Sequence, residues 1–159
     1  MEQKTLSKWL KAVILGLAVC GVIVCAGIVP SVGQSLVASY PEFENRYIPW
    51  LIFVWIAALP CYAALLLGWR IASRIGRDAT FTLENARDLK WISWLAAGDA
   101  GLVFAGDLAL WLAGLSHPGV FLLSLLIVFA GVAIAVAAAA LSHLVRKAAD
   151  LQEQSDLTI

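Results

Sequence analysis

The residues best suited to chemistry are two acids inside a long apolar segment, Asp99 and Asp107. Ionisable groups in a membrane are costly and usually face a bundle interior or a water-filled cavity. Eight helical positions place these carboxyl groups about 80° apart around the axis and roughly 12 Å apart along it. They therefore lie on neighbouring faces and cannot share a proton. They could line a proton or cation path; alternatively, Asp107 is hydrated near the surface and Asp99 hydrogen-bonds to a neighbouring helix.

Other arrangements that would support catalysis are missing from the sequence. His117 lies in a short turn and His143 near the far end of the next apolar segment, so they cannot form one metal site in a monomer. There is no Ser-His-Asp order, helical pair of metal-binding histidines or phosphate-binding Gly-rich loop. Cys20, Cys25 and Cys61 lie in apolar runs, which favours packing over a redox or zinc role. The sequence predicts no enzyme activity, catalytic residue, cofactor or metal.

A charged segment in the middle of the chain, about residues 70–90, is the second candidate site. Its positive charges could bind anionic lipid headgroups, each contributing about 1 kcal/mol near the surface. Thr82, with Glu84 and Asn85 after it, is typical of a helix N-terminus. Phe81 could pack back on the first turn as a hydrophobic staple. The segment is either a lipid-anchoring loop that fixes topology or a docking surface.

Four apolar segments must position these residues. The chain has 159 residues, 62% of them hydrophobic and 14% charged, with a mean hydropathy of +0.87. A soluble domain is about half apolar and about a quarter charged. Segments of about 20 mostly apolar residues, long enough to cross a membrane, occur at about residues 12–29, 48–69, 91–114 and 120–144. The sequence predicts one all-α domain over residues 1–159, an integral membrane bundle of four transmembrane helices.

Basic residues predict the orientation of these spans. Every Lys and Arg except Arg46 falls in one of three groups. The groups are Lys4, Lys8 and Lys11; Arg70, Arg74, Arg77, Arg87 and Lys90; and Arg146 and Lys147. Cytoplasmic segments carry an excess of Lys and Arg, so all three groups, and both termini, are predicted to be cytoplasmic (N-in/C-in). The third helix is expected to begin in water near Thr82 and to continue through Trp94 into its span.

Small residues and prolines predict how the helices pack. The fourth span contains Gly131 and four alanines at residues 137–140, and the third contains Gly98, Gly101, Gly106 and Gly114. Small residues allow membrane helices to approach closely, and only a short turn joins these two spans, so we expect them to be neighbours. Pro60 should kink the second span. Most tryptophans lie near span ends, as interfacial residues do, and only Trp55 is expected well inside the hydrocarbon.

The middle segment resembles an uncharacterised bacterial membrane family, domain of unknown function 2975. The matching pattern between the second and third spans is Phe81, Glu84, Asn85, Leu89 and Ile92, with basic residues interspersed. The four-span layout extends the resemblance to most of the chain, and Asp88 stands where a basic residue is expected. Members of the family are often encoded beside small helix-turn-helix transcription regulators. The resemblance therefore implies the membrane component of a regulatory pair and assigns no role to the intramembrane acids.

Two functional hypotheses follow. The first is a non-enzymatic regulator or sensor in the bacterial cytoplasmic (inner) membrane. It would dock a cytosolic partner, such as a helix-turn-helix transcription regulator, through the tail from Arg146 and the middle loop. The docking residues expected in that loop are Phe81, Glu84, Asn85 and Arg87. The alternative is a small oligomeric transporter or proton-coupled carrier that uses Asp99 and Asp107. Membrane lipids and other copies of the chain are further expected partners, and the zero net charge argues against direct nucleic-acid binding.

Overall fold

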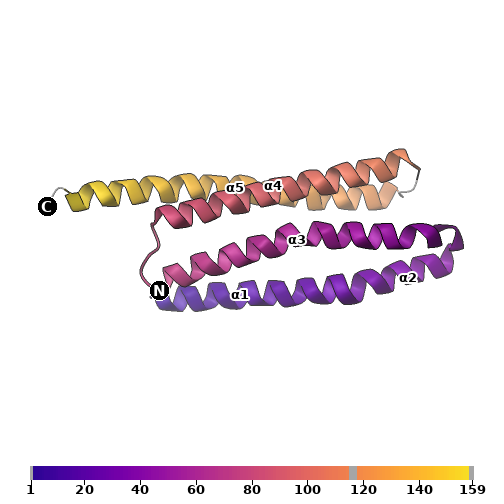
Figure 1. The fold of residues 1–159 in the computed structure, drawn as a ribbon, viewed down its shortest axis with the longest axis horizontal. Coiled ribbons are helices and arrows are strands. Elements are labelled where there is room, and N and C mark those ends of the chain that lie inside the picture. Colours follow the sequence, from indigo (N-terminus) through magenta and orange to yellow (C-terminus); the bar gives the residue numbers. More distant parts are fainter. Residues whose placement is uncertain (1, 115–117, 158–159) are drawn as a thin grey trace.

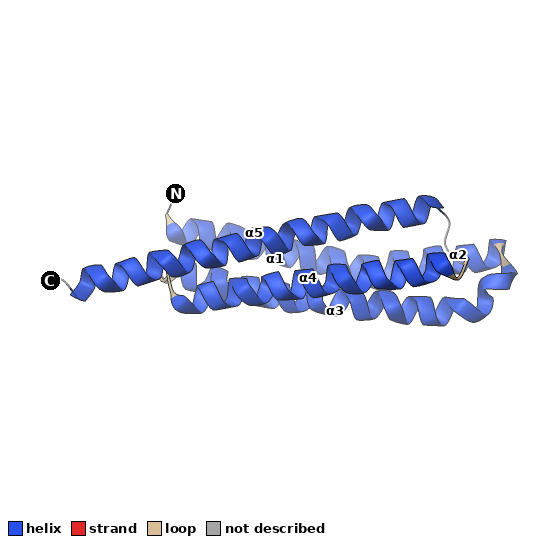
Figure 2. Cartoon of the chain, turned by 90° about the horizontal axis from the view of Figure 1, so that it is seen from above, coloured by secondary structure: helices blue, strands red, loops and turns tan. Residues whose placement is uncertain are grey.

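The computed structural model describes residues 2–114 and 118–157. In these residues the chain forms four long helical rods and no strand (Figures 1 and 2). The rods are α1 (Gln3–Ile23), continued by a π-helical turn (Val24–Ile28) and α2 (Val29–Ser39); α3 (Glu44–Ile75); α4 (Leu83–Leu112); and α5 (Pro118–Leu157). Each is long and apolar enough to cross a membrane. The prediction of an all-α protein with four candidate transmembrane helices is confirmed.

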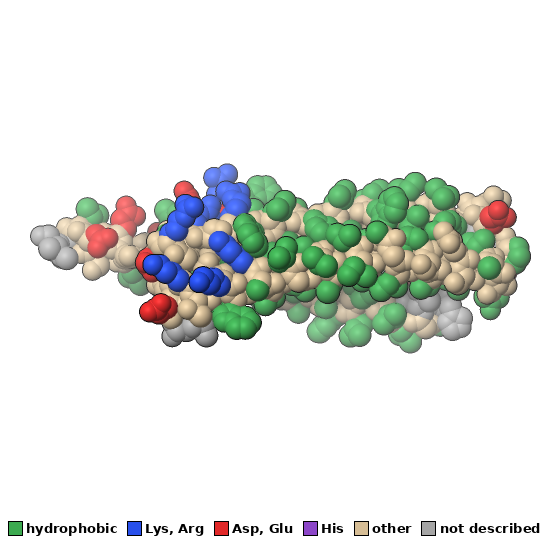
Figure 3. All heavy atoms as spheres, turned by 90° about the horizontal axis from the view of Figure 1, so that it is seen from below, with side chains coloured by type: hydrophobic (Ala, Val, Ile, Leu, Met, Phe, Trp, Pro, Cys, Tyr) green, Lys and Arg blue, Asp and Glu red, His purple; other side chains and the backbone are tan. Residues whose placement is uncertain are grey.

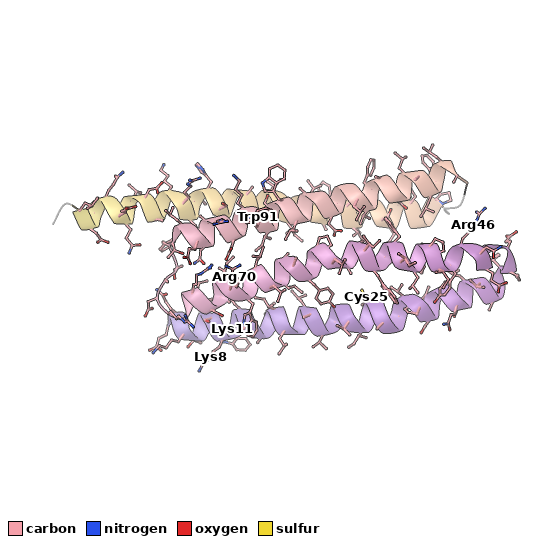
Figure 4. All side chains as sticks on the ribbon, in the orientation of Figure 1. Lys8, Lys11, Cys25, Arg46, Arg70 and Trp91 are labelled. Carbon is pink, nitrogen blue, oxygen red and sulfur yellow. The ribbon has the colours of Figure 1, made fainter. Side chains whose placement is uncertain are left out.

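The rods form an open bundle in which contacts follow chain order. Within the described ranges, α1 packs on α3, α3 on α4, and α4 on α5, and no contact joins α1 to α5. Both termini lie at the same end of the molecule (Figure 1), as the N-in/C-in prediction requires. Figure 4 shows Lys8, Lys11 and Arg70 toward this end and Arg46 at the opposite end. We refer to the end with the termini as the basic end.

The interior of the bundle is built from small side chains. Among the residues whose burial the structure describes, the buried apolar ones are all alanines: Ala72, Ala86, Ala100, Ala135 and Ala138. Large aliphatic side chains instead cover the outside along most of the length (Figure 3). This distribution is the one expected in lipid, where apolar side chains have no reason to leave the solvent and helices associate through close backbone approach.

The most extensive helix contact joins α4 and α5, as the small residues predicted. A Cβ atom added to Gly131 would lie only 3.2 Å from the Cβ of Ala100, so the glycine permits the close approach. Ser93 Oγ donates a hydrogen bond to the carbonyl of Ala135 across the same contact, at 2.8 Å. α4 and α5 are therefore the most closely packed pair of helices in the bundle.

Not every glycine of the third span contributes to this packing. Gly98 and Gly101 have open space where a Cβ would stand, so the expectation that they lie at a helix contact is wrong for a single chain. Gly106 faces the Phe53 ring of α3 instead, and no side chain would fit between them. Close approach in α4 thus depends on its alanines and on Gly106.

Prolines shape two of the rods without ending them. α3 changes direction near its middle (Figure 1), where Pro60 lies, so the predicted kink is confirmed. Pro30 stands at the start of α2, and the first rod continues to Ser39 instead of ending near residue 29. The π-helical turn ends at Ile28, two residues before this proline, which removes one backbone donor from the ladder.

The π-helical turn receives its missing donor from α3. In a π-helix a carbonyl accepts from the N–H five residues later, and for Cys25 that residue is Pro30, which has no N–H. The indole Nε1 of Trp55 donates to the Cys25 carbonyl at 3.0 Å. Trp55, the tryptophan expected deep in the hydrocarbon, thereby satisfies a backbone group that lipid could not.

The last helix extends well beyond the predicted span. α5 has 40 residues and is therefore about 60 Å long, about twice the thickness of a hydrocarbon core. Arg146 and Lys147 mark the predicted membrane boundary, and the helix continues from there to Leu157. Figure 2 shows this end of α5 projecting past the other helices.

Candidate functional site

The loop between α3 and α4 is organised by Arg74, close to the C-terminal end of α3. Its Nη1 donates to Asp88 Oδ2 at 2.6 Å and to Asn85 Oδ1 at 3.1 Å. Its Nε lies 3.1 Å from Glu84 Oε2. One guanidinium thus joins the end of α3 to three side chains in the first two turns of α4. We call Arg74, Glu84, Asn85 and Asp88 the Arg74 cluster.

Asn85 is the most buried member of this cluster, with 1% of its surface exposed. Its Nδ2 donates to the carbonyls of Ala79 at 3.0 Å and Thr80 at 2.9 Å. Its backbone N–H donates to Thr82 Oγ1 at 3.2 Å, so the predicted helix start at Thr82 is confirmed. Asn85 holds the loop closed and offers no surface to a partner, which corrects its place among the predicted docking residues.

The other predicted docking residues lie on the surface. Phe81 is 54% exposed, and the Glu84 side chain is 75% exposed in spite of its contact with Arg74. Arg87 is exposed and makes no ion pair within the described residues. Docking by these three residues stays a prediction. Asp88, which stands where the family resemblance leads us to expect a basic residue, is only 5% exposed and is the buried partner of Arg74.

Phe81 also borders a hollow formed with the projecting end of α5. The hollow has a volume of about 350 Å³, and its lining is Phe81, Ala149, Gln152, Glu153, Asp156 and Leu157. Leu157 is 82% exposed, and Leu151, on the same projecting turns, is 58% exposed. Figure 3 shows acidic side chains on this projecting end, beyond the basic side chains. We call this region the Phe81 hollow.

The two intramembrane acids face different neighbours. Cys61 Sγ of α3 donates to Asp99 Oδ2 at 3.4 Å, so Asp99 does hydrogen-bond to a neighbouring helix. Asp107 is buried and accepts a hydrogen bond from Ser124 Oγ of α5, so the interpretation of Asp107 as a hydrated surface group is wrong. Asp99 Oδ1 is buried and has no partner in the part of the chain that the structure describes. The structure does not bring the two carboxyl groups together.

The histidines and cysteines do not form a catalytic or metal-binding group in the part of the chain that the structure describes. His143 is exposed on α5, whereas His117 lies outside the described residues. Cys20, Cys25 and Cys61 are unpaired thiols. Among residues 2–114 and 118–157, no group of three or more His, Cys, Asp or Glu side chains could hold a metal ion.

Two comparisons relate the chain to known proteins. A family model described as "Protein of unknown function (DUF2975)" matches residues 31–159. The chain is also 31% identical over 139 residues to the "Uncharacterized membrane protein YoaS" of Bacillus subtilis (strain 168), covering 85% of this chain and 86% of that protein. No solved structure matches. The matched region contains the Arg74 cluster, the Phe81 hollow and both intramembrane acids.

Proposed function

This chain belongs to the DUF2975 family of membrane proteins of unknown function, and we propose that it is a non-enzymatic regulator or sensor that docks a cytosolic partner. The proposal places it in the bacterial cytoplasmic membrane with its basic end in the cytoplasm, because Lys and Arg gather there (Figure 3). The observation that carries the proposal is the Phe81 hollow, which lies beyond that basic boundary.

The composition of the Phe81 hollow favours a protein partner. Single exposed apolar residues are common on any surface, but several around one hollow are typical of an interaction site. Phe81, Ala149 and Leu157 supply its apolar lining, and Glu153 and Asp156 supply negative charge beside them. A partner segment that is basic and partly apolar would complement this surface.

The Arg74 cluster supports docking by holding the surface in place. Asn85 closes the loop through the carbonyls of Ala79 and Thr80, only a residue or two before Phe81. A surface that is already ordered loses less conformational entropy on binding. The loop side of the hollow is thus prepared for a partner before the partner arrives.

The expected partner is a helix-turn-helix transcription regulator, the class that the family resemblance implies. Proteins of this class carry basic surfaces for DNA phosphates, and an acidic hollow would attract the same surfaces. Docking at the membrane would then compete with DNA binding, so a change in the bundle could hold or release the regulator.

Affinity capture tests this proposal. The protein is solubilised in mild detergent from its native cells, and the captured proteins are identified by mass spectrometry. The variant Phe81→Ala/Glu153→Gln/Asp156→Asn should lose a partner that the wild type retains. The matched control, Glu42→Gln/Glu44→Gln, removes two acids at the opposite end and should retain it. An identical set of captured proteins from all three forms would refute the docking site.

The alternative, a proton-coupled carrier, has one supporting observation, the unpartnered Oδ1 of Asp99. A carboxyl oxygen without a partner in a membrane is costly and is the kind of group that transport uses. Asp99→Asn should then abolish proton-dependent flux in vesicles, whereas Asp107→Asn, at a carboxyl already bonded to Ser124, should have a smaller effect. Unchanged flux in the Asp99 variant would exclude this alternative.

A further inference from the structure

A groove with a volume of about 1020 Å³ opens between α3 and α4 near the basic end. Its lining farther from the basic end is apolar and includes Leu66 and Leu67 of α3, of which Leu66 is 69% exposed. Its outer part includes Arg70 of α3 and Arg87 of α4. Figure 4 shows Arg70 and Trp91 on these two helices, toward the basic end. The groove therefore changes from apolar to cationic along the helices, in the direction in which a membrane changes from acyl chains to headgroups.

Two of the arginines in this groove are available to a ligand. Arg74 is already engaged by the carboxylates of Glu84 and Asp88, at 3.1 Å and 2.6 Å. Arg70 is 3.8 Å from Asp88, and its side chain is 59% exposed. Arg87 has no ion pair within the described ranges. With three arginines and two carboxylates in its lining, the groove carries an excess of one positive charge, displayed by Arg70 and Arg87.

Tryptophans mark the depth of this charged region. Trp69 and Trp91 line the groove beside the two arginines, and indole rings favour the headgroup level of a bilayer. Lys11 Nζ of α1 lies 5.3 Å from the centre of the Trp69 ring, which adds a further cation at the same level. Arg70 and Arg87 are thus placed where lipid phosphates lie.

We propose that this groove binds one anionic phospholipid, with its phosphate on Arg70 and Arg87 and an acyl chain along Leu66 and Leu67. Guanidinium groups match phosphate oxygens in geometry and charge, and basic pockets between transmembrane helices bind anionic headgroups. A soluble phosphate compound would use the arginines but leave the apolar part empty. The apolar part favours a lipid as the source of the phosphate.

Native mass spectrometry of the delipidated protein tests the proposal. The probes are phosphatidylglycerol and phosphatidylcholine with identical acyl chains, added to the detergent-solubilised wild type. One phosphatidylglycerol should bind per chain in preference to phosphatidylcholine. Arg70→Gln/Arg87→Gln should weaken that binding roughly 30-fold, about fivefold for each arginine. Arg146→Gln/Lys147→Gln removes the same charge from α5, outside the groove, and should bind like the wild type.

Three results would overturn the proposal. Equal binding of both lipids by the wild type would exclude headgroup selection. An equal loss in the Arg146 and Lys147 control would show general attraction to charge. Competition by glycerol 3-phosphate at the lipid's own concentration would identify a soluble ligand. If the double arginine variant loses its helical circular dichroism signal, Leu66→Trp replaces it as the test. This substitution places a larger side chain in the apolar part of the groove and keeps every charge. It should also weaken the binding of phosphatidylglycerol.

Discussion

Replacing Asn85 by alanine should open the loop between α3 and α4 while leaving the transmembrane helices folded. The substitution removes two neutral hydrogen bonds to Ala79 and Thr80 and one bond from the charged Arg74. A neutral bond contributes about 1 kcal/mol net, and a bond to a charged group about 1.5–3 kcal/mol. Together they predict a loss of about 3.5–5 kcal/mol in the free energy of opening the loop, which corresponds to a roughly 400- to 5000-fold larger open population.

Hydrogen exchange measured by mass spectrometry reports this opening. In peptides covering residues 76–86, the amides of Ala79 and Ala86 are bonded within the loop and the first turn. Their exchange should accelerate by the same factor, because exchange follows the population of the open state. Thr82→Ala removes one capping bond and should accelerate exchange only about fivefold, as expected for a loss of about 1 kcal/mol.

Two outcomes would refute this reasoning. Exchange at the wild-type rate in Asn85→Ala would mean that the buried amide does not hold the loop. Equal acceleration in Asn85→Ala and in Arg87→Ala would point to a general effect of substitution, since Arg87 is exposed and outside the Arg74 cluster. Faster exchange throughout α4 and α5 would show that the variant destabilises the bundle and not the loop alone.

Three further predictions concern the bundle, each measured as the free energy of unfolding in mixed detergent micelles. Ser7→Ala should cost about 1 kcal/mol, because the Ser7 hydroxyl donates to the buried end of α3 at the Ala72 carbonyl at 2.6 Å; no loss would mean that water replaces it. Gly131→Val should cost about 1–3 kcal/mol by forcing α4 and α5 apart, whereas Gly16→Val, with open space around it, should change stability by less than about 0.5 kcal/mol. Trp55→Phe should cost about 1–2 kcal/mol by removing the donor to the π-helical turn, and a wild-type value would show that the carbonyl needs no partner.

The fold could be predicted from the sequence because lipid imposes one strong constraint. Backbone groups in hydrocarbon must be satisfied within the segment, so a long apolar run has to be a helix. The contact between α4 and α5 was predictable for a similar reason, since Gly131 and the neighbouring alanines mark close approach. The cap at Thr82 was readable because its pattern is local.

Two helices are longer than the hydropathy pattern predicted, for physical reasons that hydropathy does not report. The first rod passes through Pro30 because a π-helical turn and the indole of Trp55 compensate for the missing donor. That compensation needs a hydrogen bond between Trp55 and Cys25, 30 positions apart in the sequence and on different helical rods. The length of α5 was also missed, since residues after Lys147 are polar enough to leave the membrane yet good helix formers.

The sequence predicted which region holds the candidate site, but not which of its charged residues pair with one another. Counting Lys and Arg predicts which segments are cytoplasmic, because topology depends on their sum. Binding depends on which charges are already paired, and pairing is set by the fold. Arg74 and Asp88, 14 positions apart across a loop, form the shortest ion pair of the Arg74 cluster, and the sequence alone gave no reason to join them.

The two proposed binding surfaces, the groove between α3 and α4 and the Phe81 hollow, have different linings. Arg74 connects them. Arg70 and Arg87 line the groove proposed to bind lipid, and Phe81 lines the Phe81 hollow beside α5. Arg74 contacts the acids that line the groove and also Asn85, which holds the loop before Phe81. A lipid phosphate on Arg70 would compete with Asp88 for that side chain, and Asp88 would keep its bond to Arg74, which also bonds Asn85. Lipid binding and partner docking would then be coupled through Arg74, although neither Arg70 nor Arg87 lines the Phe81 hollow.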